Sequence, residues 1–351
     1  MNVRAIFALV CLLIFSPGSV GAQGFAGLGS ETEGFALPEP NPEFIFPADH
    51  GAHPDFRIEW WYVTANLEGP DGEPYGIQWT LFRTAVRPDE AESWSSPQVW
   101  FAHAAATTRT GHYVTERYAR GGIGQAGVTA APFSAWIDEW EMSGESVASV
   151  RLTAGSSQFA YDLSLEAQGP IVFQGEGGYS VKSDEGQASY YYSQPHYSVA
   201  GTLTLPEEGE IAVTGSAWLD REWSSQPLSE RQTGWDWFSL HFDSGEKMMG
   251  YLMRQTDALP YAVSTWIDRE GVATLLPVGA LSAEPVEHTS VAGRKVPTTW
   301  RLQLPERELD IEVAALNPFA WNDTTFAYWE GPVFADGSHA GRGYLEMTGY
   351  E

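Results

Sequence analysis

The chain has 351 residues and carries 46 acidic against 19 basic side chains, a formal net charge of −27 at pH 7. This acidity argues against nucleic acid and anionic membranes as partners, because binding either one needs clustered positive charge. A strongly hydrated surface suited to saline surroundings is the simplest explanation of the charge. The length exceeds that of one ordinary domain, so two domains are expected.

The N-terminal segment has the features of a Sec-type secretory signal. Arg4 precedes an apolar run over residues 5–15, and small residues at 20–22 offer a cleavage site. No later segment approaches the ~18 consecutive apolar residues that a membrane span needs. The sequence therefore predicts a signal peptide at residues 1–22 and an exported protein, periplasmic or secreted, that is not an integral membrane protein after cleavage.

The cysteine content bounds the chemistry of the mature chain. The only cysteine, Cys11, lies inside the predicted signal. Disulfides, thiolate metal sites and a cysteine nucleophile are therefore not expected after cleavage. Residues 23–43 are rich in Gly, Glu and Pro, which predicts a flexible tether ahead of the first domain.

From residue 44 onward the pattern is that of β-hairpins. Short segments rich in aromatic and β-branched residues, such as 59–67 and 75–83, are separated by turn residues. We find no sustained 3.6-residue periodicity longer than about three turns, which disfavours an α/β fold. The sequence therefore predicts an all-β protein whose antiparallel sheets form barrels or sandwiches.

A weak internal similarity helps to place a domain boundary. Glu-Trp-Trp-Tyr at 59–62 and Trp-Asp-Trp-Phe at 235–238 are each followed by a turn and a second predicted strand, so each could open a barrel. The polar segment between the two halves is then the crossover, although a break nearer Tyr197 also fits. The predicted domains are residues 44–226 and 227–351.

The first candidate cluster, at residues 49–62, combines two histidines, three carboxylates and several aromatic side chains. A divalent metal could use His50 and His53 with Asp49. However, Gly and Pro make this segment a loop of unspecified geometry, and no further pair of familiar metal spacing follows. Hydrogen bonding of the imidazoles to the backbone and to Glu59 is favoured, and no metal site is predicted.

The second cluster places a carboxyl beside an indole. Trp218 and Asp220 lie two residues apart on a predicted strand and so point to the same face. In apolar surroundings the pKa of Asp220 should rise, and the carboxyl could donate a proton near neutral pH. The alternative is that Asp220 pairs with Arg221 or Arg254 and only ties two domains together.

The third cluster contains three consecutive tyrosines at 190–192, followed by Pro195 and His196. The proline limits this segment to a strand end or edge. The phenols and the imidazole could line a pocket, but tyrosines at a domain interface would give the same pattern. We find no Gly-x-Ser-x-Gly elbow and no phosphate-binding Gly-rich loop, so a hydrolase nucleophile cannot be assigned.

Five motifs carry a resemblance to a known family. They are FPADHGAH at 46–53, EWWY at 59–62, GSAWLDREW at 215–223, WDWF at 235–238 and GYLEMTGY at 343–350. Together they resemble the AttH/carotenoid 1,2-hydratase family, also called hydroxyneurosporene synthase-like, over about residues 44–351. The resemblance implies two lipocalin-like β-barrels packed together and no metal or organic cofactor.

The resemblance also implies a reaction. Its hydratase branch adds water to an isolated carbon–carbon double bond of an acyclic carotenoid, and the acid lies in an aromatic-x-Asp motif that matches residues 218–220. Asp220 is then the proton donor and Trp218 the stabiliser of the carbocation. The residues expected to bind the apolar substrate are Glu59, Trp61, Tyr191, His196, Trp223, Trp235 and Trp237.

This sequence differs from the hydratase branch of the family in two places. The hydratase branch has tyrosine where this chain has Trp218, and an upstream His-x-Trp pair that this chain lacks. The pattern is more similar to the exported AttH-like branch, whose members are often labelled predicted secreted hydrolases and often accompany ABC-type export systems. Two functions are therefore considered: a cofactor-free hydratase of an isoprenoid or lipid-like compound, and a non-catalytic carrier or accessory protein of an ABC-type exporter.

Overall fold

The computed structural model describes residues 33–88, 93–226, 228–229 and 231–350. The predicted signal peptide and the first part of the predicted tether lie outside these residues. In residues 33–43 the N–H groups of Ala36 and Glu39 donate hydrogen bonds to the Asp55 carbonyl and the Tyr190 hydroxyl. This part of the segment is therefore fastened to the first sheet rather than free. Among the described residues, no helix is long and apolar enough to cross a membrane.

The first sheet contains thirteen antiparallel strands, with β4-β3-β2-β1-β13-β12-β9-β8-β7-β6-β5 in order and β10 and β11 on β12. These strands are β1 (Ile58–Glu68), β2 (Pro74–Ala85), β3 (Gln98–Thr107), β4 (His112–Arg120), β5 (Ala126–Ala130), β6 (Phe133–Ile137), β7 (Trp140–Ser146), β8 (Ser149–Gly155), β9 (Ala160–Ala167), β10 (Val172–Phe173), β11 (Tyr179–Val181), β12 (Ala188–Leu205) and β13 (Gly209–Ser224). Because β6 contacts β2, β3 and β4 across the interior, the sheet is nearly closed into a barrel.

The second sheet contains ten antiparallel strands, with β17-β16-β15-β14-β23-β22-β20-β19-β18 in order and β21 on β22. They are β14 (Gln232–Phe242), β15 (Lys247–Gln255), β16 (Tyr261–Ile267), β17 (Ala273–Leu275), β18 (Ser282–Val291), β19 (Arg294–Leu304), β20 (Leu309–Ala315), β21 (Trp321–Asn322), β22 (Tyr328–Gly337) and β23 (Gly341–Met347). Short 3-10 turns at Ala48–His50, Ser93–Ser95 and Pro305–Arg307 complete the described elements. The prediction of an all-β, lipocalin-like fold is confirmed.

Side-chain alternation gives each sheet its own core. On β1, Trp61, Val63 and Ala65 point into the first barrel, and on β14 Phe238 and Leu240 point into the core of the second sheet. Each fully buried side chain of this size stabilises the fold by about 1.5–3 kcal/mol. The intervening residues of these two strands face the other way, toward the neighbouring sheet.

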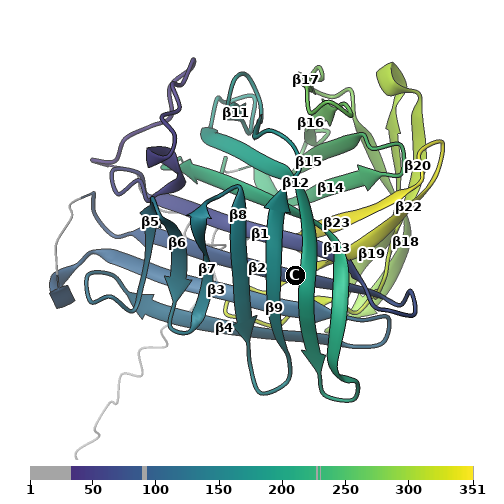
Figure 1. The fold of residues 1–351 in the computed structure, drawn as a ribbon. Coiled ribbons are helices and arrows are strands. Elements are labelled where there is room, and N and C mark those ends of the chain that lie inside the picture. The colour runs from purple at the N-terminus through teal and green to yellow at the C-terminus, as the bar shows by residue number, and fades with distance from the viewer. Residues whose placement is uncertain (1–32, 89–92, 227, 230, 351) are drawn as a thin grey trace, which may run out of the picture.

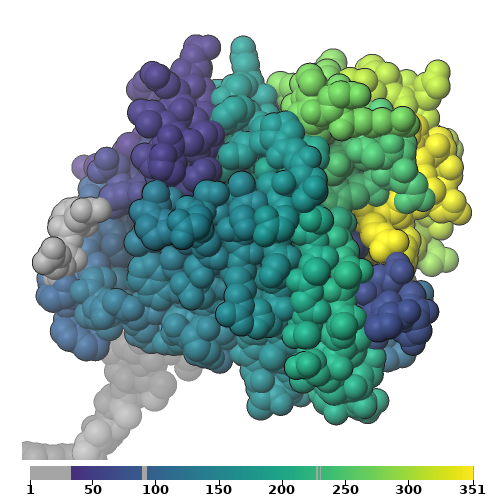
Figure 2. Space-filling view, viewed as in Figure 1, coloured from purple at the N-terminus to yellow at the C-terminus, as the bar shows by residue number. Residues whose placement is uncertain are grey.

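The two sheets pack against each other along β1 and β2 of the first and β22 and β23 of the second. Figures 1 and 2 show the first sheet, in purple to teal, beside the second, in green to yellow. Gly76 on β2 permits the close approach, because a Cβ added there would lie only 2.6 Å from Pro332 Cγ and 2.7 Å from the Tyr344 hydroxyl. The seam between the sheets is therefore tight at this point.

Candidate functional site

One row of polar side chains crosses the seam-facing side of the first sheet. The strand register places Ser193 on β12 opposite Asp220 on β13, and Asp220 opposite Tyr62 on β1. Directly opposed residues in antiparallel strands point to the same face. The sequence prediction that Asp220 shares a face with Trp218 is confirmed, since both lie buried on this side of β13.

A second row crosses the facing side of the second sheet. Its register aligns Tyr251 on β15, Trp237 on β14, Glu346 on β23 and Glu330 on β22. The Tyr62 ring meets the Trp237 ring edge to face, with centroids 5.3 Å apart. The two rows therefore face each other across the seam, and strands far apart in sequence supply neighbouring side chains.

A cavity of about 120 Å³ lies between the rows. Its walls are mostly apolar and include seven aromatic side chains, and they also carry carboxyl groups and one ammonium group. The lining residues include Tyr62, Tyr191, Trp237, Asp220, Glu346 and Lys182. Concave, largely apolar sites with a few placed polar groups are the usual form of small-molecule binding sites.

Asp220 is the most deeply placed acid of the cavity, with an exposed fraction of 2%. Its Oδ1 accepts hydrogen bonds from Trp218 Nε1 at 2.6 Å and Ser193 Oγ at 2.5 Å, and its Oδ2 accepts one from the Tyr191 hydroxyl at 2.5 Å. Burial raises the pKa of Asp220 to about 7 although these three donors act to lower it. No salt bridge to Asp220 occurs in the described chain; the expected alternative partners, Arg221 and Arg254, pair with other acids.

The other carboxyl groups between the two sheets differ in their ion pairs and hydrogen bonds. Glu222 lies 2.9 Å from the ammonium group of Lys182. Glu346 accepts a hydrogen bond from Trp235 Nε1 at 2.6 Å, and burial raises its pKa to about 7. Glu330, behind Tyr62, accepts hydrogen bonds from the Tyr62 hydroxyl and from Asn322, and burial raises its pKa well above the usual range. Burial therefore raises the pKa of three carboxyl groups along the seam, Asp220, Glu330 and Glu346.

Trp218 takes a different place from the one predicted. Its indole does not line the cavity, but its Nε1 holds Asp220 from the side. It therefore positions the acid, while Trp237 and Tyr62 present aromatic faces to the cavity.

The Trp218→Phe variant tests this positioning role. Loss of one donor to the charged form of Asp220 is expected to raise the pKa of this carboxyl above its value of about 7. Carboxyl 13C NMR of aspartate-labelled protein measures the change. Trp136→Phe is the matched control, because that indole donates only to the Gly124 carbonyl on an exposed surface. An unchanged Asp220 titration would show that Trp218 only fills space.

The remaining predicted residues separate into two groups. Tyr191, Trp235 and Trp237 line the cavity. Glu59, Trp61 and Trp223 do not line it, because strand alternation turns them toward the interior of the first barrel. His196 also lies elsewhere, in a separate hollow with His241 and Lys247. We therefore leave these four residues out of the proposed site.

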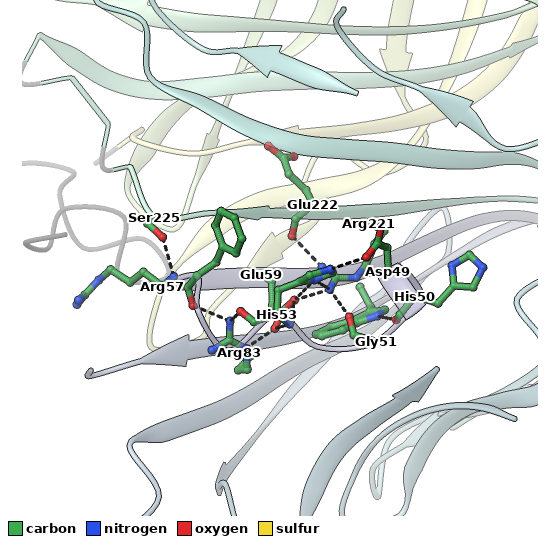
Figure 3. A network of polar contacts seen from close by, with 12 residues as sticks. Asp49, His50, Gly51, His53, Arg57, Glu59, Arg83, Arg221, Glu222 and Ser225 are labelled. Atoms are coloured by element: carbon green, nitrogen blue, oxygen red, sulfur yellow. Dashed lines mark hydrogen bonds and ion pairs between the residues drawn. The ribbon is translucent and has the colours of Figure 1, made fainter. Parts of the chain in front are cut away.

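The predicted loop cluster forms a buried ionic network inside the mouth of the first barrel. Glu59 accepts hydrogen bonds from Arg83 and Arg221 (Figure 3). His53 stacks on Trp223 with ring centroids 4.0 Å apart. Glu222 points away from this network toward the seam (Figure 3). Within the described residues, no group of His, Cys, Asp and Glu has the arrangement of a metal site. The expected hydrogen bond between the His53 imidazole and Glu59 is present, with Nδ1 of His53 3.2 Å from Oε2 of Glu59.

Sequence reasoning missed several cavity residues, among them Tyr62, Lys182 and Glu346. Tyr62 was within reach, because it alternates with Trp61 and so must face opposite to it. Glu346 is brought beside Trp237 by pairing between β14 and β23, which are distant in sequence. Lys182 lies in a short connection before β12 and has no local signal.

Comparisons with known proteins agree with this architecture. The AttH-like family model matches residues 37–350. An AttH protein from Nitrosomonas europaea is 34% identical, with a TM-score of 0.82 over 90% of this chain and 99% of that one. Kievitone hydratase from Nectria haematococca has a TM-score of 0.66 at 14% identity, over 90% of this chain and 96% of that one.

A more distant solved structure is CghA with Sch210972, which has a TM-score of 0.55 at 12% identity, over 91% of this chain and 97% of that one. At these low identities the second and third likenesses show the fold alone. A comparison with curated proteins finds no match. The family model and the 34% identical relative are decisive: the chain belongs to the AttH-like family.

Proposed function

We propose that this protein is a cofactor-free hydratase that adds water to a carbon–carbon double bond of an apolar, isoprenoid or lipid-like compound. The observation that carries the proposal is a buried carboxyl, Asp220, whose pKa is raised to about 7 in the wall of an aromatic cavity. A general acid works best when its pKa lies near the working pH. The hydratase of the same fold is consistent with this chemistry.

The reaction follows from the placement of the groups. Asp220 transfers its proton to one alkene carbon, which leaves a carbocation on the more substituted carbon. The faces of Tyr62 and Trp237 stabilise this cation, as aromatic rings do for cations within about 6 Å. Water adds to the cation and loses a proton, so that the alkene gains one molecule of water and the acid is restored.

The proposal extends to the place of action. The signal-like segment at residues 1–22 supports export to the periplasm or beyond. An ABC-type export system is the partner that the family resemblance implies. Fractionation of cells that express the tagged full chain tests this part. Recovery of the uncleaved chain in the cytoplasm would contradict it.

The Asp220→Asn variant tests the catalytic role. Prenylated and other alkenyl compounds with a trisubstituted double bond are incubated with the protein, and the hydrated product is measured by mass spectrometry. Loss of the acid is expected to lower kcat by about 10²–10⁴-fold while binding changes little. Asp162→Asn on the exposed face of β9 is the control and should retain full activity.

The carrier hypothesis gives a different result in the same experiment. Binding with no turnover by the wild type, and equal affinity in Asp220→Asn, would replace the hydratase by a non-catalytic carrier of apolar ligands. Native mass spectrometry of the purified protein shows whether such a ligand is bound.

A further inference from the structure

Glu346 stands apart from the other acids of the seam because one of its oxygens is uncommitted. Its Oε1 accepts the hydrogen bond from Trp235 Nε1, and this is the only hydrogen bond that Glu346 makes among the described residues. The side chain is half-buried and lines the cavity. The second oxygen, Oε2, is therefore available to a molecule in the cavity.

The neighbouring acids are already engaged. Both oxygens of Glu330 accept hydrogen bonds, one from Tyr62 and one from Asn322, and Glu330 does not line the cavity. Glu222 is neutralised by Lys182 at 2.9 Å and accepts a hydrogen bond from Ser189. Of the carboxyls that face the cavity, Glu346 is thus the one placed to bind a water molecule directly.

Glu346 and Asp220 also interact electrostatically, so that the charge of Asp220 affects the pKa of Glu346. The negative charges of Asp220 and Glu222 add to burial in raising the pKa of Glu346. Glu330 lies directly opposite on β22, and Lys182 stands next to Glu222. Two coupled carboxyls with pKa values near 7 hold about one proton between them near neutral pH.

We infer that Glu346 is the second catalytic residue of the site and acts as the general base for the attacking water, across the cavity from Asp220. This inference rests on the proposed hydratase function. As Asp220 gives its proton to one alkene carbon, water forms a C–O bond to the other, and Glu346 takes the proton that water releases. Return of that proton to Asp220 through solvent restores both groups, so that atoms and charge balance.

The inferred pair predicts a bell-shaped dependence of kcat on pH, in which each carboxyl accounts for one limb. Glu346 must be ionised, so kcat falls as the pH drops below its pKa. Asp220 must be protonated, so kcat falls as the pH rises above its pKa. The maximum is therefore expected near pH 7.

The Glu346→Gln variant tests the inference on the full chain, with the same alkenyl compounds. It is expected to lower kcat at least about 10²-fold with little change in KM, and to remove the acidic limb from the residual activity. Glu208→Gln, outside the cavity, is the control. Wild-type kcat in Glu346→Gln together with an inactive Asp220→Asn would overturn the role of Glu346 and leave the hydratase function standing. Full activity in both variants would overturn the hydratase function itself.

A titration of the ligand-free protein gives a readout that does not depend on turnover. Carboxyl 13C NMR of glutamate-labelled protein follows Glu346, which is assigned by its loss in Glu346→Gln. Removal of the neighbouring charge in Asp220→Asn is expected to lower the pKa of Glu346. An unchanged Glu346 titration would mean that the two carboxyls are not coupled, which would overturn the inferred pair.

Discussion

Replacement of Glu59 by alanine is expected to lower the free energy of unfolding by about 3–5 kcal/mol. Glu59 is fully buried, and it accepts hydrogen bonds from Arg83 and Arg221, which are themselves 1% and 0% exposed. Removing the carboxylate leaves two guanidinium groups in the barrel without their counter-charge. The cost arises from these unpaired buried charges rather than from the lost contact alone.

Urea unfolding followed by tryptophan fluorescence measures the effect. The control is Asp162→Ala, which breaks an exposed ion pair with Arg151 and is expected to cost about 0–1 kcal/mol. A loss in Glu59→Ala no larger than in this control would show that water reaches the network and screens it. The network would then not be part of the buried structure.

The Asp220→Asn variant is expected to be more stable than the wild type at pH 8, with the difference vanishing near pH 4. The pKa of Asp220 is raised from 3.8 to about 7 on folding. Between these values the folded state holds a proton that the unfolded state has released, so the stability of the wild type falls as the pH rises. Each pKa unit corresponds to about 1.4 kcal/mol, which places the largest effect on the order of 4 kcal/mol.

The hydrogen bonds around Asp220 can also be made by the amide group of the Asp220→Asn variant. Its oxygen can accept from Trp218 and Ser193, and its NH₂ group can donate to the Tyr191 hydroxyl oxygen. Thermal unfolding from pH 4 to pH 8 gives the comparison, with Asp310→Asn as an exposed control that should show no such gain. A stability difference independent of pH would contradict the raised pKa and remove the main support for Asp220 as an acid.

The sequence predicts this fold well because its signals are local. Alternation of aromatic and polar residues predicted the hairpin strands 59–67 and 75–83. The first is β1, which is longer by one residue at each end, and the second is β2, which is longer by one residue at its start and two at its end. Turn residues between short strands, and the lack of helical periodicity, then predicted the antiparallel all-β class. None of these signals depends on residues distant in the chain.

The site was predictable only in part because it depends on which faces meet. Two-residue spacing correctly placed Trp218 and Asp220 on one face. The same alternation separates Trp60 and Tyr62 from Glu59 and Trp61, but it does not say which pair faces the second sheet. That choice is made by the packing of β1 against β23, and the register between β14 and β23 then brings Glu346 beside Trp237.

Because the two sheets approach each other closely at Gly76, the size of the side chain at this position determines the distance between them. Asp220 is carried by one sheet and Glu346 by the other, so any side chain that wedges the sheets apart also lengthens the gap that a proton and a water molecule must bridge. A methyl group at position 76 would act in this way by pressing on Pro332 and Tyr344, neither of which lines the cavity. Substitutions between the two sheets can therefore change kcat, or the width of the substrate that fits, from one family member to another. Every chemical group of the cavity is retained in such variants.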